Sequence, residues 1–153
     1  MHAHVIGQLR PLALACALAT LSLLAGFACG GAPSDEKLLE RFVEDVTGRV
    51  DAAQVDRALS YVALSEQPVD VRVPQMSGVF DEARGSELAS AYRRTMQRFI
   101  GSELRVRSRK IEIEGDTADV RLTLVTQYGA VRVELSLRKL SSGWKVSRVS
   151  VDR

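Results

Sequence analysis

Residues 118–137, ADVRLTLVTQYGAVRVELSL, alternate apolar with polar side chains on both sides of a Tyr128-Gly129 turn. The apolar positions before the turn are Ala118, Val120, Leu122 and Leu124, and those after it are Val131, Val133, Leu135 and Leu137. A period of two places successive side chains on opposite faces of a strand. The stretch therefore predicts two antiparallel strands joined by a hairpin, with one face buried.

A further strand precedes this hairpin and changes its parity partway along. Leu104 and Val106 alternate with arginines, whereas Ile111 and Ile113 occupy the opposite parity. One extra residue in the strand accounts for such a shift, so a bulge is predicted near Ser108 to Lys110.

A final strand follows a Ser-Ser-Gly turn at residues 141–143. Its apolar residues change parity between Val146 and Val149, which predicts a second bulge. Three short turns, the first at residues 114–116, thus join four long strands. We expect the C-terminal half to form a curved four-stranded antiparallel meander.

Helical patterns occupy the region before these strands. Ser34 is a suitable N-cap for a first helix that Gly48 would end. Asp51 is followed three residues later by Gln54, a capping-box pattern that predicts a second, shorter helix. Apolar residues recur at helical spacing in both segments, so each helix is expected to pack one face against the sheet.

A third helix is expected from Ser86 to the region of Gly101. Before it, residues 69–73 alternate valine with polar side chains, and Pro74 follows them. This short segment is predicted to be an extended edge piece that the proline ends. Helices followed by a meander predict the α+β class.

The first 28 residues have the three parts of an export signal. Arg10 precedes an apolar run from Leu12 to Phe27, and Ala28 provides a small residue before a cut. The arrangement resembles a bacterial lipoprotein signal, in which Cys29 would become the lipid-bearing first residue of the mature chain. Gly26 departs from the aliphatic residue usual in that pattern. A plain secretory cut and an uncleaved anchor are the alternatives.

These boundaries predict a signal peptide at 1–28, a lipidated tether at 29–33 and one domain at 34–153. The expected location is the cell envelope, with the lipid in the outer membrane or at the periplasmic face; without lipidation the protein would be secreted. A domain of about 120 residues can bury a core without disulfides.

Composition excludes several kinds of chemistry. His2 and His4, the two histidines of the chain, lie in the predicted leader, so histidine-dependent nucleophilic catalysis and most zinc sites are excluded from the domain. Neither a metal nor a cofactor is expected. The net charge of +2 does not indicate a nucleic-acid partner.

Charge is nevertheless distributed unevenly. Residues 34–90 hold 12 acidic and 6 basic side chains, whereas residues 91–153 hold 7 acidic and 14 basic ones. Solvated helix and sheet surfaces explain this pattern, and a basic ligand-binding face is the alternative. Arg105, Arg107 and Arg109 share one strand face unless the bulge turns Arg109. They either keep an exposed sheet soluble or bind an anionic surface.

The order of elements, the 114–118 hairpin and the closing Gly143-Trp144-Lys145-Val146 strand together resemble the nuclear transport factor 2-like superfamily, which includes ketosteroid isomerase. The resemblance covers nearly all of residues 34–151. It implies helices and a curved sheet that enclose a cone-shaped pocket. The residues expected to line such a pocket are Phe42, Tyr61, Tyr92, Met96 and Trp144. For Tyr92 and Trp144, packing in the core is the favoured role, and a part in the pocket is the alternative.

No catalytic residue is assigned, because no spacing singles one out. The primary hypothesis is a non-enzymatic, membrane-anchored module that binds an envelope protein or a small apolar ligand. The alternative is a small isomerase- or hydrolase-like enzyme with a pocket carboxylate and tyrosine, drawn from Asp45, Asp56, Tyr61 and Tyr92. A homodimer formed through the open sheet face is a third expectation.

Overall fold

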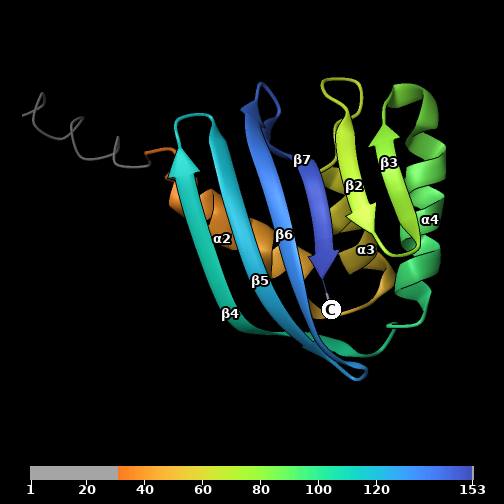
Figure 1. Cartoon of the computed structure of the whole chain (residues 1–153). Coiled ribbons are helices and arrows are strands. Elements are labelled where there is room, and N and C mark those ends of the chain that lie inside the picture. The colour runs from red at the N-terminus through yellow and green to blue at the C-terminus, as the bar shows by residue number, and fades with distance from the viewer. Residues whose placement is uncertain (1–30, 153) are drawn as a thin grey trace, which may run out of the picture. The chain divides into compact units, whose positions relative to one another are not determined.

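A computed structural model describes residues 31–152 (Figure 1). Cys29 and the predicted signal peptide lie outside the described residues. The fold belongs to the compact unit Ser34–Arg153. No helix among the described residues has the length and apolar character needed to span a membrane.

The described residues form three α-helices, one short 3-10 helix and seven strands. The helices are α2 (Asp35–Val46), α3 (Ala52–Ser60), η1 (Glu82–Arg84) and α4 (Gly85–Gln97). The strands are β1 (Gly48–Arg49), β2 (Val69–Val73), β3 (Met76–Phe80), β4 (Glu103–Glu114), β5 (Thr117–Thr126), β6 (Gly129–Leu140) and β7 (Gly143–Asp152).

Local capping explains where the first two helices begin. The Ser34 side chain accepts a hydrogen bond from the backbone N–H of Lys37 at 3.4 Å. Asp51 accepts one from the backbone N–H of Gln54 at 2.7 Å. These bonds satisfy donors that the first turn of a helix leaves free. Both starts agree with the sequence prediction.

The sheet is larger than the predicted four strands. Strands β4 to β7 follow one another as antiparallel neighbours, but the full order is β1-β4-β5-β6-β7-β2-β3. Strand β2 pairs parallel with β7, and β3 pairs antiparallel with β2. The predicted edge piece is therefore an inner strand, because β7 and β3 pair with its two sides, and Pro74 lies in its turn to β3.

Both predicted bulges are present. In β4 the register shifts between Val106 and Ser108, slightly earlier than expected. In β7 the neighbouring pairs are Leu137–Val146 and Ser136–Arg148, so Ser147 is the extra residue. The first bulge turns Arg109 away from the face of Arg105. Arg109 pairs with Leu122 and forms an ion pair with Glu40 of α2 at 3.4 Å.

The core lies between the inner face of the sheet and the helices, with α2 and α3 crossing behind the strands in Figure 1. Leu39 of α2 is fully buried, as is Val120 of β5. Leu137 and Trp144 complete this packed region from β6 and β7. A smaller cluster joins α3 and α4 to the start of β4, and its buried members are Val50, Val55, Met96 and Leu104.

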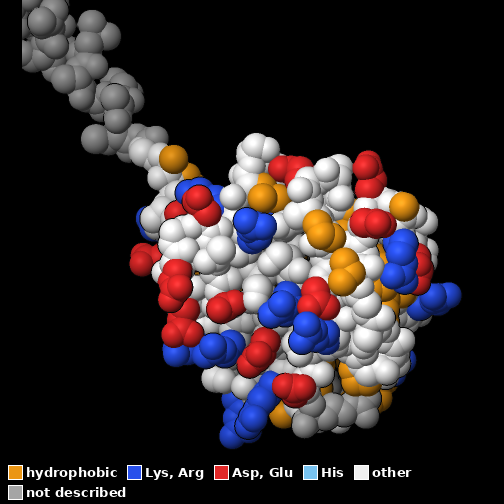
Figure 2. Space-filling view, turned by 45° about the horizontal axis from the view of Figure 1, so that its top comes forward, with side chains coloured by type: hydrophobic (Ala, Val, Ile, Leu, Met, Phe, Trp, Pro, Cys, Tyr) orange, Lys and Arg blue, Asp and Glu red, His pale blue; other side chains and the backbone are white. Residues whose placement is uncertain are grey.

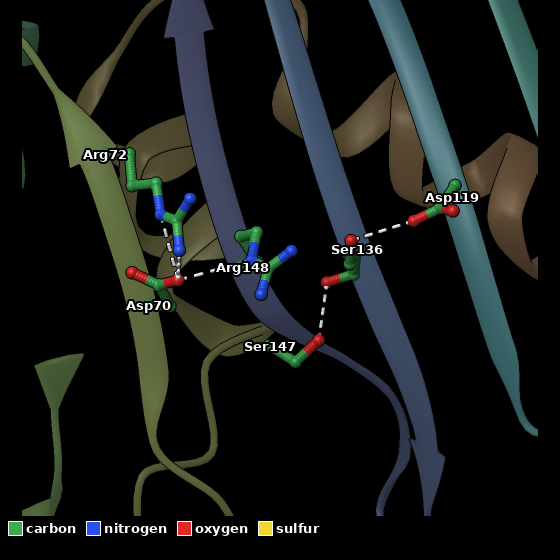
Figure 3. Close-up of polar contacts among 6 residues, drawn as sticks. All are labelled: Asp70, Arg72, Asp119, Ser136, Ser147 and Arg148. Carbon is green, nitrogen blue, oxygen red and sulfur yellow. Dashed lines mark hydrogen bonds and ion pairs between the residues drawn. The ribbon is translucent and has the colours of Figure 1, made fainter.

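The outer face of the sheet is polar. Asp70 of β2 accepts hydrogen bonds from Arg72 at 3.1 Å and from Arg148 of β7 at 3.3 Å, and the Ser136 hydroxyl donates to Asp119 at 2.8 Å (Figure 3). Figure 2 shows acidic and basic side chains side by side, with small separate apolar patches. Mixed charge of this kind keeps an open sheet face soluble.

Candidate functional site: an apolar cavity

A cavity of about 950 Å³ lies between the inner sheet face and the helices. Strands β2, β5, β6 and β7 form one wall, and α2, α3 and α4 contribute to the other. The apolar side chains that line it include Phe42, Leu59, Val69, Val71, Leu88, Met96, Leu122, Leu124, Val133, Leu135, Val146 and Val149. The volume is at the upper end of the range for small-molecule sites.

Side-chain exposure shows which end of the cavity is open. Deep lining residues such as Val69 and Leu122 are 1% and 3% exposed. At the other end, Tyr128 is 68% exposed and Pro74 is also exposed. Figure 1 places the β5–β6 hairpin and the end of α4 at the lower end of the fold and the β2–β3 turn above them, beside α4, and residues of all three segments line the cavity. The mouth of the cavity therefore lies among these three segments.

Side-chain contacts hold the mouth in shape. The ring of Tyr128 packs edge-on against Phe99, with centroids 5.5 Å apart. Thr126 stabilises the hairpin because its hydroxyl donates to the Gly129 carbonyl and accepts from the Tyr128 N–H, both at 3.0 Å. Gly129 has a φ of +116°, which an L side chain rarely adopts. The β5–β6 hairpin is thus tied to the region that follows α4.

Few polar side chains reach the cavity. Those that line it are Gln75, Tyr92, Thr95, Arg98, Thr126 and Tyr128. Among the described lining residues none carries a carboxylate, and Arg98 is the one charged side chain. Burial raises the pKa of Tyr92 to about 12, so its phenol is protonated at neutral pH. The Tyr92 hydroxyl has no hydrogen-bond partner among the described residues.

Three of the five residues expected to line a pocket do so in the structure: Phe42, Tyr92 and Met96. Tyr61 and Trp144 do not line the cavity. Trp144 is only 4% exposed, and its indole N–H donates to Asp35 at 3.0 Å, which fixes it in the packed core. Tyr61 stands edge-on behind Phe42, with ring centroids 4.8 Å apart.

A carboxylate–tyrosine pair exists, but outside the cavity. The Tyr61 hydroxyl donates to Asp45 at 2.6 Å, and Arg57 lies 3.7 Å from the other carboxylate oxygen of Asp45. Burial and the bond to Asp45 raise the pKa of Tyr61. Asp56 instead pairs with Arg93 at 3.1 Å. The residues proposed for catalysis are therefore not brought together with Tyr92 at one surface.

Sequence reasoning missed most of the mouth. Arg98, Tyr128, Pro74 and Gln75 come from turns and a helix end, where no apolar period marks an inward side chain. Parity does identify Leu124, Val133 and Val149 as inward-facing. Whether an inward side chain meets another or lines a cavity depends on the distance to the facing helix. Among residues 31–152, no group of three or more metal-ligating side chains lies together.

Neither a protein-family model nor a curated protein matches this sequence. Solved structures match its fold. A nuclear transport factor 2-like protein with a cystatin-like fold from Novosphingobium aromaticivorans is 17% identical, with a TM-score of 0.54 over 90% of this chain and 88% of that one. A candidate ketosteroid isomerase from Parabacteroides distasonis is 10% identical, with a TM-score of 0.57 over 77% of this chain and 86% of that one.

A third similar structure is a nuclear transport factor 2-like protein of unknown function from Pseudomonas putida. It is 12% identical, with a TM-score of 0.55 over 76% of this chain and 82% of that one. The fold of this chain is therefore nuclear transport factor 2-like, as the sequence resemblance implied. Identity at this level establishes fold, whereas function depends on the residues of the site.

Proposed function

We propose that this domain is a non-enzymatic module that binds a small apolar molecule in its cavity, and that a lipid on Cys29 holds it at the cell envelope. The open cavity of about 950 Å³ with apolar walls is the observation that carries the proposal. Side chains around an unfilled cavity lack the packing contacts that would otherwise stabilise a small domain. Occupation by a ligand would recover those contacts.

The free energy gained by burying an apolar ligand in the cavity is large enough for micromolar affinity. A ligand that buries about 300 Å² of its own surface and covers a similar area of wall removes about 600 Å² from water, worth about 15 kcal/mol. Association entropy and ordering offset roughly half of this. The remaining 7 to 8 kcal/mol, approximately, corresponds to a micromolar dissociation constant.

The alternative is an isomerase- or hydrolase-like enzyme with a carboxylate and a tyrosine at the substrate. A general base must lie within about 3 Å of the proton that it removes. Tyr92 lines the cavity as a potential hydrogen-bond donor, but the Asp45–Tyr61 pair lies behind Phe42. The absence of a carboxylate among the described lining residues therefore favours binding over proton-transfer chemistry.

A pair of tryptophan variants tests the binding site. Val131 lines the cavity near its mouth and pairs with Leu124, whereas Val125 on the neighbouring strand lies on the opposite face. The uncharged fluorophore N-phenyl-1-naphthylamine serves as the probe. Val131→Trp is expected to weaken its binding at least about tenfold by filling the mouth, while Val125→Trp leaves binding unchanged. Wild-type affinity in Val131→Trp would contradict the cavity as the site.

Mass spectrometry of the native protein tests the proposed anchor separately. We expect a mature N-terminus at Cys29 that carries an acyl-modified glyceride, and loss of membrane association in Cys29→Ala. A mature N-terminus at Cys29 without added lipid mass would rule out this part of the proposal, and it would leave the cavity argument unaffected.

A further inference from the structure

Arg98 is the one charged residue among the described residues that line the cavity, and it lies directly at the end of α4. It caps the C-terminus of that helix and is exposed. Its position at the mouth follows from the residues around it. The Arg98 carbonyl accepts from the Gln127 side-chain amide at 3.4 Å, and the Tyr128 hydroxyl lies 3.5 Å from the same oxygen. The backbone of Arg98 is thus tied to the β5–β6 hairpin, beside the opening.

The guanidinium of Arg98 has no acidic partner among the described residues. Two nearby arginines are paired, Arg84 with Glu87 at 2.9 Å and Arg93 with Asp56 at 3.1 Å, whereas Arg94 of α4, which does not line the cavity, is in no described ion pair. No described ion pair includes Arg98. The cavity wall offers it no carboxylate either. A cation at the opening of an apolar chamber is therefore available to a ligand.

Thr95 gives this end of the wall a second polar group. It lines the cavity three residues before Arg98, so the two side chains occupy one side of the helix end. Beyond them the walls are apolar except for the Tyr92 phenol, and on β6 the lining runs from Val131 to Leu135, roughly 14 Å along the strand. The charged residue of the lining thus lies at the mouth, and most of the interior surface is hydrocarbon.

We infer that the ligand is an amphiphile with an anionic head group, whose hydrocarbon part fills the cavity and whose head group binds the Arg98 guanidinium. This inference rests on the proposed binding function and specifies its ligand class. A carboxylate and a phosphate share the required chemistry, because both accept two parallel N–H bonds from a guanidinium. A cationic head group would meet unfavourable charge at the same place.

Competition experiments with matched twelve-carbon compounds test the head-group preference. Dodecanoate, dodecyl phosphate, dodecanol and dodecyltrimethylammonium are each titrated as competitors of N-phenyl-1-naphthylamine on the wild-type protein, at concentrations below their micelle-forming range. We expect the two anions to compete about tenfold better than the alcohol, and the cation to compete worst. The stronger of the two anions then distinguishes a carboxylate from a phosphate ligand.

Two variants assign that preference to Arg98. Arg98→Gln should remove the tenfold advantage of the anions, measured as the ratio of anion to dodecanol competition within the same variant. Arg94→Gln is the matched control, since Arg94 is an exposed arginine of the same helix that does not line the cavity, and it should retain the full preference.

The outcomes distinguish a failure of this inference from a failure of the proposed binding function. Equal competition by dodecanol and both anions in the wild-type protein would overturn the anionic ligand class and leave apolar binding intact. Retention of the anion preference in Arg98→Gln would overturn the role of Arg98. Failure of the probe and of all four compounds to bind would instead overturn the proposed binding function itself.

Discussion

The inner face of the sheet has the same alternating sequence pattern at its two ends, but its side chains are closely packed at one end and line a cavity at the other. At the packed end, Leu39 and Val120 are fully buried, and Leu137 is 1% exposed. At the open end, Val131 and Val133 of β6 face inward with the same parity but are only half-buried and line the cavity. One strand, β6, contributes to both regions. Parity thus determines which face is apolar, and the facing helix determines whether that face is filled.

Core truncations at the two ends should differ most. Leu39→Ala is expected to lower the free energy of unfolding by about 3 kcal/mol, because it empties space in a packed core. Val133→Ala should cost less than about 1 kcal/mol, since one side of the valine already faces the cavity. Urea unfolding monitored by Trp144 fluorescence measures both values. Equal losses at the two positions would show that the open end is packed as well as the closed one.

The two buried glutamines provide a second, smaller contrast. Gln54 is 0% exposed, and neither its side-chain oxygen nor its nitrogen has a hydrogen-bond partner among the described residues. Gln67 is 7% exposed, and its amide nitrogen donates to the Val146 carbonyl at 3.1 Å, while its oxygen has no partner among these residues. Gln54→Leu should therefore raise the free energy of unfolding by about 1 kcal/mol, whereas Gln67→Leu should lower it by about 1 kcal/mol.

Thermal or urea unfolding of both variants is the measurement, and each serves as the control for the other. A loss of stability in Gln54→Leu as large as that in Gln67→Leu would mean that the Gln54 amide is satisfied after all, for example by a buried water. The contrast between the glutamines would then disappear.

Acid pH should weaken the packed end through Asp35, and this is the smallest expected effect. Hydrogen bonds from Lys139 and from the Trp144 indole hold the pKa of Asp35 below the ordinary value for an aspartate. Because the folded pKa is lowered, this contribution to stability is present above the unfolded pKa of about 4 and is lost as the pH falls through the folded value.

Unfolding measured from pH 6 down to pH 2 should thus show a weaker pH dependence in Asp35→Asn than in the wild-type protein. Dodecanol binding should not change between pH 5 and pH 8, because no described cavity residue has a carboxylate. Identical acid profiles in the two proteins would mean that Asp35 contributes no pH-dependent stability.

Most of the secondary structure could be predicted from local chemistry. Ser34 and Asp51 marked helix starts, and parity changes marked both bulges. Strand β3 escaped prediction because Met76–Phe80 is short, contains Gly78 and lacks a clear alternation. The parallel pairing of β2 with β7 joins Val71 to Val149, a long-range contact that no local pattern encodes.

The candidate site was less predictable than the fold. Phe42, Tyr92 and Met96 were identified because helical periodicity and a family resemblance pointed to them. Strand parity favours core packing over a pocket role for Trp144, and its hydrogen bond to Asp35 holds it in the core. Arg98 was missed because a lone arginine at a helix end has no sequence signature. Its place in the cavity lining depends on the β5–β6 hairpin, which hydrogen-bonds to its carbonyl.

Methyl NMR spectroscopy of the mature protein tests most directly whether an apolar ligand binds in the cavity. Addition of dodecanol, an uncharged probe, should shift the methyl signals of Met96, Leu124 and Val133, which line the cavity. The signals of Leu39 and Val120 in the packed region should stay in place. Shifts confined to outer-face methyl groups such as that of Val125, or no shifts at all, would contradict binding in the cavity.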